Sequence, residues 1–337
     1  LVPVGSRTDV FTYSQDVAAA YSQLKFKWRQ GWALHAGARL EATFLEGDQQ
    51  NQATNFKNQF WNFVPSASLF RKINADNNLT LSYTQRISRP SIWDLNPNRN
   101  TQDPNNIEVG NPLLRPEILH QVEFTYALQT DRDIFVNASL FGRQTNNSIE
   151  SFISTDDQGV STVTKQNLAS NKQFGLNLST AFNPLPLWKI NSNAYMSYAR
   201  FHSEALDISN DGTLWGVNLN SSWALREEIS LQAYGEYDAR KVLLQGEEGQ
   251  RFYYSFSAKK EITSLKLTVT LTATNPFSKY LRQNEFTRGD DFESQVHNRY
   301  MIRSFRLSVN WEFGGLFRES ERRRINNDDQ KNRKASG

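Results

Sequence analysis

The chain has 337 residues, no cysteine and a formal net charge of +3; 38% of its residues are apolar and 12% are aromatic. The absence of cysteine excludes disulfide scaffolds, thiolate metal sites and cysteine nucleophiles. No apolar run approaches the ~18 residues that a transmembrane helix needs. With a mean hydropathy of -0.64, the composition alone is typical of a soluble, rather polar protein, although it is too aromatic for a disordered one.

The charge is unevenly distributed along the chain. Residues 314–337 carry seven basic and four acidic side chains, which accounts for the whole net charge and leaves residues 1–313 neutral. A nucleic-acid-binding body would show a basic face. The charge pattern therefore argues against a nucleic acid partner and predicts a polar, basic C-terminal tail.

The dominant pattern in the rest of the chain has a period of two residues. In 265–273 leucine, valine and alanine alternate with lysine and threonine, and 305–313 alternates in the same way. Because side chains on a strand point alternately to opposite faces, each such run predicts a strand with one apolar and one polar face. About thirteen runs follow this pattern, near 11–28, 31–46, 60–73, 77–88, 117–130, 133–154, 160–182, 187–203, 213–226, 229–243, 250–261, 264–275 and 296–313.

The first run, 11–28, contains one irregularity. Its apolar positions change phase between Tyr21 and Leu24. An extra residue in one strand of a pair would produce such a shift, so the sequence predicts a β-bulge there.

The connections between the runs alternate in length. Short turns lie at 27–30, 74–76, 131–132, 183–186, 227–228 and 262–263, and long polar loops lie at 47–59, 89–116, 155–159, 204–212, 244–249 and 276–295. Transmembrane β-barrels show this asymmetry, with short periplasmic turns and longer extracellular loops. Most runs also have twelve or more residues, whereas a tilted barrel strand needs ~9–11 to cross a bilayer and ordinary strands average ~5–6.

These features together predict an all-β, antiparallel, up-and-down transmembrane β-barrel. Aromatic residues near the strand ends suit an interfacial girdle; they are Trp28, Trp32, Phe44, Trp61, Phe182, Trp188, Trp215, Trp311 and Phe313. The alternative, core packing in a soluble sandwich, does not explain polar faces that run the full length of so many strands. Because bacterial single-chain barrels have an even number of strands, thirteen predicts the C-terminal part of a larger barrel.

The predicted organisation has three parts. Residues 1–8 form a linker or truncated N-terminus, 9–313 a partial outer-membrane barrel, and 314–337 a periplasmic tail. The search for catalytic residues is negative, since the four histidines are far apart and no phosphate-binding or nucleophile motif occurs. We therefore expect no enzyme activity, no cofactor and no metal site.

The most specific stretch lies between two predicted strands, at 86–117. It contains Ser-Arg-Pro-Ser-Ile-Trp-Asp-Leu-Asn-Pro at 88–97 and Gly-Asn-Pro-Leu-Leu-Arg-Pro-Glu at 110–117. This stretch resembles the barrel of TonB-dependent outer-membrane receptors, and within that group the Bacteroidetes-type outer-membrane β-barrel family. Weaker likenesses extend the resemblance over roughly residues 9–334.

The resemblance implies a barrel of 22 strands in the outer membrane of a Gram-negative bacterium. It also implies an N-terminal plug, which this chain lacks, and nutrient uptake driven by an inner-membrane TonB complex. The aromatic last strand resembles the signal read by the outer-membrane assembly machinery. Two alternatives are a passive or structural outer-membrane barrel without TonB coupling and, more distantly, a soluble β-rich carbohydrate-binding module.

Two sets of candidate site residues follow. Charged residues expected to face the lumen or a plug are Arg39, Glu41, Arg86, Arg89, Glu117 and Glu123. Whether they hold a plug or form salt bridges within the wall is open at this point. Loop aromatics that could stack on a substrate, or simply order the loops, are Trp93, Phe277, Tyr280 and Phe292.

Overall fold

The structure is a computed structural model that describes residues 10–28, 31–50, 55–131, 133–204, 206–289 and 292–313. The predicted linker at 1–8 and tail at 314–337 lie outside the described residues. No helix in the described part of the chain is both long and apolar enough to cross a membrane.

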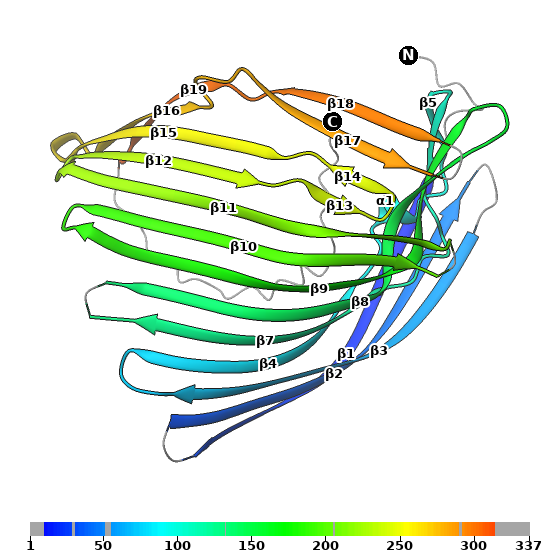
Figure 1. The fold of residues 1–337 in the computed structure, drawn as a ribbon, viewed down its shortest axis with the longest axis horizontal. Helices are drawn as coiled ribbons and strands as arrows, with labels where there is room; N and C mark the ends of the chain where they lie inside the picture. Colours follow the sequence, from blue (N-terminus) through cyan, green and yellow to red (C-terminus); the bar gives the residue numbers. More distant parts are fainter. Residues whose placement is uncertain are drawn as a thin grey trace.

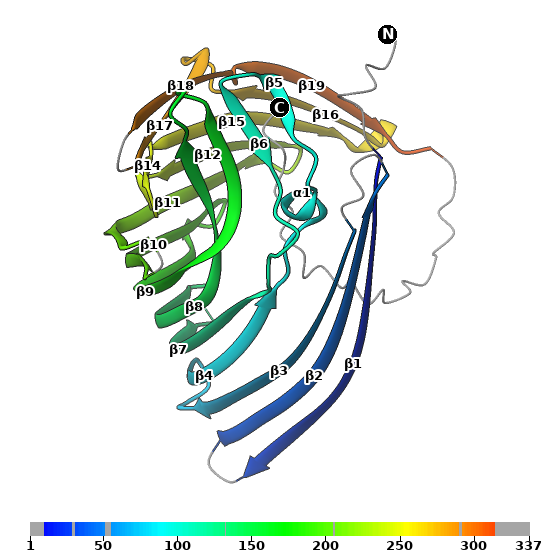
Figure 2. The same cartoon turned by 90° about the vertical axis from the view of Figure 1, so that its right-hand side faces the viewer.

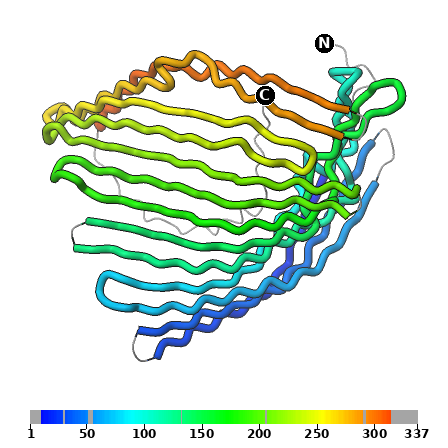
Figure 3. The backbone as a smooth tube through the Cα atoms, viewed as in Figure 1, coloured from blue at the N-terminus to red at the C-terminus, as the bar shows by residue number. Residues whose placement is uncertain are grey.

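Among the described residues, thirteen of the fifteen strands of one curved sheet pair antiparallel with their neighbours in the order β1-β2-β3-β4-β7-β8-β9-β10-β11-β12-β15-β16-β19 (Figures 1 and 2). They are β1 Phe11–Trp28, β2 Trp32–Gln49, β3 Asn55–Lys72, β4 Asn77–Ser88, β7 Glu117–Gln129, β8 Phe135–Thr155, β9 Ser161–Leu185, β10 Trp188–Ser203, β11 Ile208–Arg226, β12 Ile229–Asp238, β15 Arg251–Ile262, β16 Leu267–Thr274 and β19 Ser304–Trp311. The backbone runs back and forth without crossing itself (Figure 3), which confirms the predicted up-and-down barrel fold.

The apolar faces of the strands lie on the convex side of the sheet. The cross-strand register aligns one row of residues, all of them exposed: Leu81, Phe124, Leu140, Leu176, Met196 and Trp215. A soluble sandwich would bury such a row against a second sheet, so this arrangement contradicts the carbohydrate-binding module. In water this row would be a large exposed apolar patch, whereas in a membrane it meets lipid.

Aromatic side chains gather at both ends of the convex face. At the long-loop ends Tyr237, Phe252, Tyr254 and Phe277 form a chain of ring contacts with centroid separations of 5.2–6.5 Å. At the short-turn ends Trp28 stacks on Trp32 at 6.2 Å, and Trp188 lies 5.7 Å from Trp223. These two groups are arranged as the interfacial girdles of a barrel.

The bulge expected between Tyr21 and Leu24 is absent. The register between β1 and β2 continues without a shift from Phe11↔Gln49 to Trp28↔Trp32. The change of phase instead means that the apolar residues before it, Tyr13, Val17 and Tyr21, lie on the concave side, where Tyr13 packs against a cluster at the long-loop end. The register does shift in β8, between Thr145 and Ser148, where Asn147 adopts a positive φ of 54°.

Residues of two predicted long loops, 244–249 and 276–295, belong to a second sheet. β13 Lys241–Leu243, β14 Gly246–Glu248, β17 Tyr280–Arg288 and β18 Glu293–Met301 form a four-stranded sheet in that order. The expected single run at 296–313 is therefore split into β18 and β19, and 229–243 is split into β12 and β13. These strands continue the wall beyond the lipid belt, where polar residues occupy both faces and no apolar alternation marks them.

Candidate functional site

The site is built on the 89–116 segment, which folds back within the curve of the sheet (Figure 2). It contains the short helix α1 Ile92–Leu95 and the strands β5 Asn100–Asp103 and β6 Asn106–Val109. Proline lacks an N–H donor and biases the residue before it to extended geometry, so this proline-rich stretch leaves the sheet. It rejoins the sheet only where β6 pairs parallel with the start of β9.

Local hydrogen bonds shape the segment. Ser91 caps α1 in a reciprocal box with Asp94: its hydroxyl accepts from the Asp94 N–H, and the Asp94 carboxylate accepts from the Ser91 N–H. In the β5–β6 turn the Asp103 carboxylate accepts from the side chain of Asn106 at 2.7 Å and from the Asn105 N–H at 2.9 Å. These bonds, that of the Asn106 side chain first, lower the pKa of Asp103.

The segment lies beside a seam in the wall. Backbone pairing between β3 and β4 spans only Ser66↔Thr84 to Lys72↔Asn78. Beyond that point β3 continues along β2 and β4 continues along β7. Within the described residues, no backbone ladder therefore joins the long-loop halves of β3 and β4.

A buried ion pair spans this seam. Arg89, at the end of β4, is only 1% exposed and pairs with the Glu41 carboxylate on β2. Its Nε donates to Thr43 Oγ1 at 3.0 Å. Arg39 reaches the other Glu41 oxygen at 2.5 Å, so Glu41 lies between two arginines. A planar guanidinium that bonds to two side chains on β2 ties the two sides of the seam together.

Apolar contacts pack the segment above the ion pair. Leu95 and Leu114 are fully buried and form a cluster with Leu45 of β2 and Ile149 of β8. Around this cluster the Nδ2 atoms of Asn58 and Asn111 donate to the carbonyls of Pro112 and Lys165 at 2.8 and 2.9 Å. The side-chain oxygen of Asn167 accepts from the Arg115 N–H at 2.8 Å. The segment is thus held to β2, β3, β8 and β9.

One side of the segment is open and forms a pocket of about 500 Å³. Trp93, which is 76% exposed, lies at this pocket. The side-chain oxygens of Asn96, Asn98 and Asn100 accept hydrogen bonds from within the protein. Their side-chain Nδ2 atoms have no partner among the residues that the structure describes. The pocket therefore offers an aromatic face and several hydrogen-bond donors.

The structure divides the predicted lumen residues into two groups. Arg39, Glu41 and Arg89 meet at the seam. Glu117 is buried, lies opposite Ser88 at the end of β4, and accepts from the Ile149 N–H at 2.8 Å. Arg86 is exposed and Glu123 bonds to Gln121 on its own strand, so neither joins the seam cluster in the described part of the chain.

The four predicted aromatics do not share one pocket. Trp93 lines the pocket described above, while Phe292 lines a separate one of about 170 Å³ at the tip of β8. Phe277 stacks on Tyr254 in the convex aromatic group. The Tyr280 ring lies 3.8 Å from the guanidinium carbon of Arg299. Of the four, Trp93 alone lies at a pocket on the 89–116 segment.

The sequence reasoning missed a second polar network on the concave face. Arg251 of β15 bonds to Glu236 and Asp238 of β12, each at 2.7 Å. Asp238 also accepts from the Tyr195 hydroxyl at 3.0 Å. These residues lie far apart in sequence and become neighbours only through the register of β10, β11, β12 and β15. Alternation placed them on a polar face, but it did not show which of them meet.

The fold and the site define the class of the protein. A curved antiparallel sheet with an apolar, aromatic-edged convex face and a charged concave face is the wall of a membrane-spanning β-barrel. Among the described residues no cluster of His, Asp and Glu side chains suits a metal ion.

Comparison with known proteins identifies the family. Residues 1–311 match the model of the outer membrane protein beta-barrel family, and the chain belongs to that family. Its place is therefore the outer membrane of a Gram-negative cell, which confirms the predicted location. No curated protein matches the sequence.

Solved structures support the fold. The copper transporter OprC aligns with a TM-score of 0.67 and 15% identity over 89% of this chain and 48% of its own. The ferric yersiniabactin uptake receptor FyuA from Yersinia pestis aligns with a TM-score of 0.63 and 15% identity over 91% and 47%. The siderophore receptor PiuA from Acinetobacter baumannii aligns with a TM-score of 0.61 and 15% identity over 89% and 44%. The chain spans about half the length of these proteins.

Proposed function

We propose that this chain is the C-terminal barrel wall of a TonB-dependent receptor that imports a nutrient, and that the pocket at Trp93 contacts the cargo. The observation that carries the proposal is the 89–116 segment. It lies within the curve of the sheet, is fastened by the Arg89–Glu41 pair, and displays Trp93 at an open pocket. The solved structures of similar fold include a copper transporter and a siderophore receptor.

A receptor needs a surface that binds cargo before transport, and the 89–116 segment offers such a surface at the Trp93 pocket. The charged network at Arg251 supports the same proposal, because it leaves a half-exposed arginine and two carboxylates on the concave face. A plug domain with complementary charges would pair with them.

Conductance across planar lipid bilayers tests receptor against pore without knowledge of the cargo. We expect the full-length protein, including any segment that precedes this chain, to show no steady conductance. A stable open channel would contradict the receptor and support the passive barrel.

Cargo binding tests the role of Trp93. Whole cells that produce the full-length protein would be incubated with labelled Cu²⁺ and with a labelled ferric catecholate. For the probe that binds, we expect Trp93→Ala to lower affinity at least tenfold, because it removes the aromatic face of the pocket. The control is Phe277→Ala, on the convex side. Loss of the TonB complex is expected to abolish import but to leave surface binding unchanged.

A further inference from the structure

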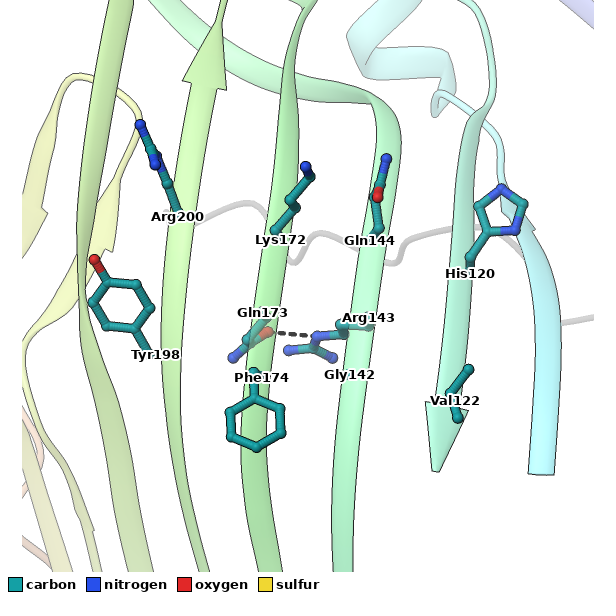
Figure 4. Close-up of a pocket in the computed structure, with 10 residues that line it drawn as sticks. All are labelled: His120, Val122, Gly142, Arg143, Gln144, Lys172, Gln173, Phe174, Tyr198 and Arg200. Carbon is teal, nitrogen blue, oxygen red and sulfur yellow. Dashed lines mark hydrogen bonds between the residues drawn. The ribbon is translucent and has the colours of Figure 1, made fainter. Parts of the chain in front are cut away.

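A second site lies on the convex face of the barrel, away from the lumen. The register places His120 opposite Gln144, Gln144 opposite Lys172, and Lys172 opposite Arg200. Their side chains stand side by side across β7, β8, β9 and β10 (Figure 4). The next row on the same face, two residues nearer the short turns, holds Val122, Gly142, Phe174 and Tyr198. Basic and polar groups thus lie directly above the apolar belt.

The height of this row corresponds to the outer boundary of the membrane. Ten residue steps along the chain separate Gln144 from Ile134, which lies beside the short turn. At ~3.4 Å per residue and a tilt of roughly 40°, this spans about 26 Å, close to the ~25 Å height of the apolar band in such barrels. Because the long loops are extracellular, the row lies at the level of the outer-leaflet headgroups.

Two basic residues of the row lie directly beside each other. Lys172 and Arg200 are exposed and directly opposed on neighbouring strands, where like charges repel each other. Neither has an ion pair among the described residues, and Arg200 donates only a long 3.4 Å bond to Ser209. Asp211 lies opposite Arg200 on β11 and accepts from the Tyr198 hydroxyl at 2.5 Å; it keeps its negative charge and offsets one of the two positive charges. An anion between Lys172 and Arg200 would neutralise the remaining positive charge.

The surface beneath the row is shaped for a lipid. These residues line a hollow of about 490 Å³. The space over Gly142 is open, because a Cβ at that position would meet no atom within 4 Å. Exposed Val122 and Phe174 flank the glycine. The hollow therefore joins an apolar floor for acyl chains to a cationic rim.

We propose that this hollow binds the phosphorylated glycolipid of the outer leaflet. Arg200 and Lys172 contact a phosphate group, Arg through its planar fork and Lys as a point charge. Gln144 and His120 face the sugar hydroxyls, and the acyl chains lie over Val122, Phe174 and the Gly142 gap. The site lies on the outer surface of the wall and is independent of cargo import through the lumen.

The test measures binding of lipid A to the protein purified from outer membranes in detergent, by native mass spectrometry. Probes are lipid A with both phosphates, fully dephosphorylated lipid A, and inorganic phosphate. We expect the bisphosphorylated form to bind at least tenfold more tightly than the dephosphorylated form. We expect the double variant Lys172→Gln/Arg200→Gln to lose that preference, and Lys172→Arg/Arg200→Lys to retain most of it.

The matched control is Arg71→Gln/Lys260→Gln. It removes one arginine and one lysine from the short-turn end of the convex face. We expect it to change lipid A affinity less than twofold. Heat-modifiable gel mobility confirms that each variant is folded. Equal binding of the two lipid forms, or unchanged preference in the double glutamine variant, would overturn the proposal. Competition by inorganic phosphate at concentrations similar to those of the lipid would also overturn it, because it would show a simple anion site.

Discussion

The concave face carries the same chemistry in two different surroundings. At the seam one carboxylate, Glu41, lies between two arginines, and Arg89 is 1% exposed under the 89–116 segment. On the other half of the sheet one arginine, Arg251, lies between two carboxylates and is 46% exposed. The first cluster is sealed by the chain's own segment, while the second remains open to whatever fills the lumen. The two clusters therefore differ in burial more than in charge: the buried cluster stabilises the fold, and the exposed cluster is available to a partner.

The largest effect is expected from the buried cluster. Arg89→Ala leaves Glu41 with one arginine fewer in a buried position, and breaking such a pair costs about 3–5 kcal/mol. The free energy of unfolding from lipid vesicles in urea measures the loss. The double variant Arg89→Met/Glu41→Leu should recover part of it, because it removes both charges. A loss below ~1 kcal/mol for Arg89→Ala would show that the pair does not fasten the seam.

The next largest loss of stability is expected from the packing of the 89–116 segment. Leu114 is fully buried, and Leu114→Ala should cost roughly 3 kcal/mol in the same assay. Its neighbour Leu113 is 80% exposed and supplies the matched control. Leu113→Ala should change stability by less than about 0.5 kcal/mol. Equal effects of the two variants would mean that the segment is not packed as the structure shows.

The exposed cluster at Arg251 should contribute less to the free energy of unfolding. Arg251→Ala removes two partly exposed ion pairs, and such pairs are worth about 0.2–1 kcal/mol each. The loss should shrink as salt is raised, because exposed charges are screened. A salt-independent loss as large as that of Arg89→Ala would erase the distinction between the two clusters.

The smallest effect concerns the β5–β6 turn at the tip of the sealed segment. Because hydrogen bonds lower the pKa of Asp103 in the folded state, its contribution is complete above the ordinary aspartate pKa of ~3.9 and is lost as pH falls through the lower, folded value. Hydrogen exchange of residues 100–109 should therefore stay slow at pH 5. Asp103→Ala should speed exchange there at pH 5, and unchanged exchange would contradict this.

The sequence predicted the sheet well because membrane strands must alternate between lipid and lumen. Prediction failed where that constraint ends. β17 was read as part of a loop, because beyond the lipid belt both of its faces are polar. The change of phase in β1 was read as a bulge, because the apolar residues of its first half lie on the concave side and break the simple two-face pattern.

The candidate site was predictable only in part. Arg89 and Glu41 were chosen as charged lumen residues, but their contact across β3 needs the three-dimensional path of the segment. The row from His120 to Arg200 was not foreseen, because basic residues on a convex face are visible only once the register is known.

The central claim is that the convex face of this sheet contacts lipid, and strand β9 tests it most directly. Because the chain has no cysteine, single cysteines at 173, 174, 176, 177, 178 and 179 can each carry a spin label as the sole reporter; Gly175 is left out because a Cβ there would clash with Met196. In proteoliposomes the account predicts that collision with lipid-soluble oxygen alternates with a period of two, high at 174, 176 and 178 and low at 173, 177 and 179. Uniform collision rates, or a maximum at the odd positions, would contradict it.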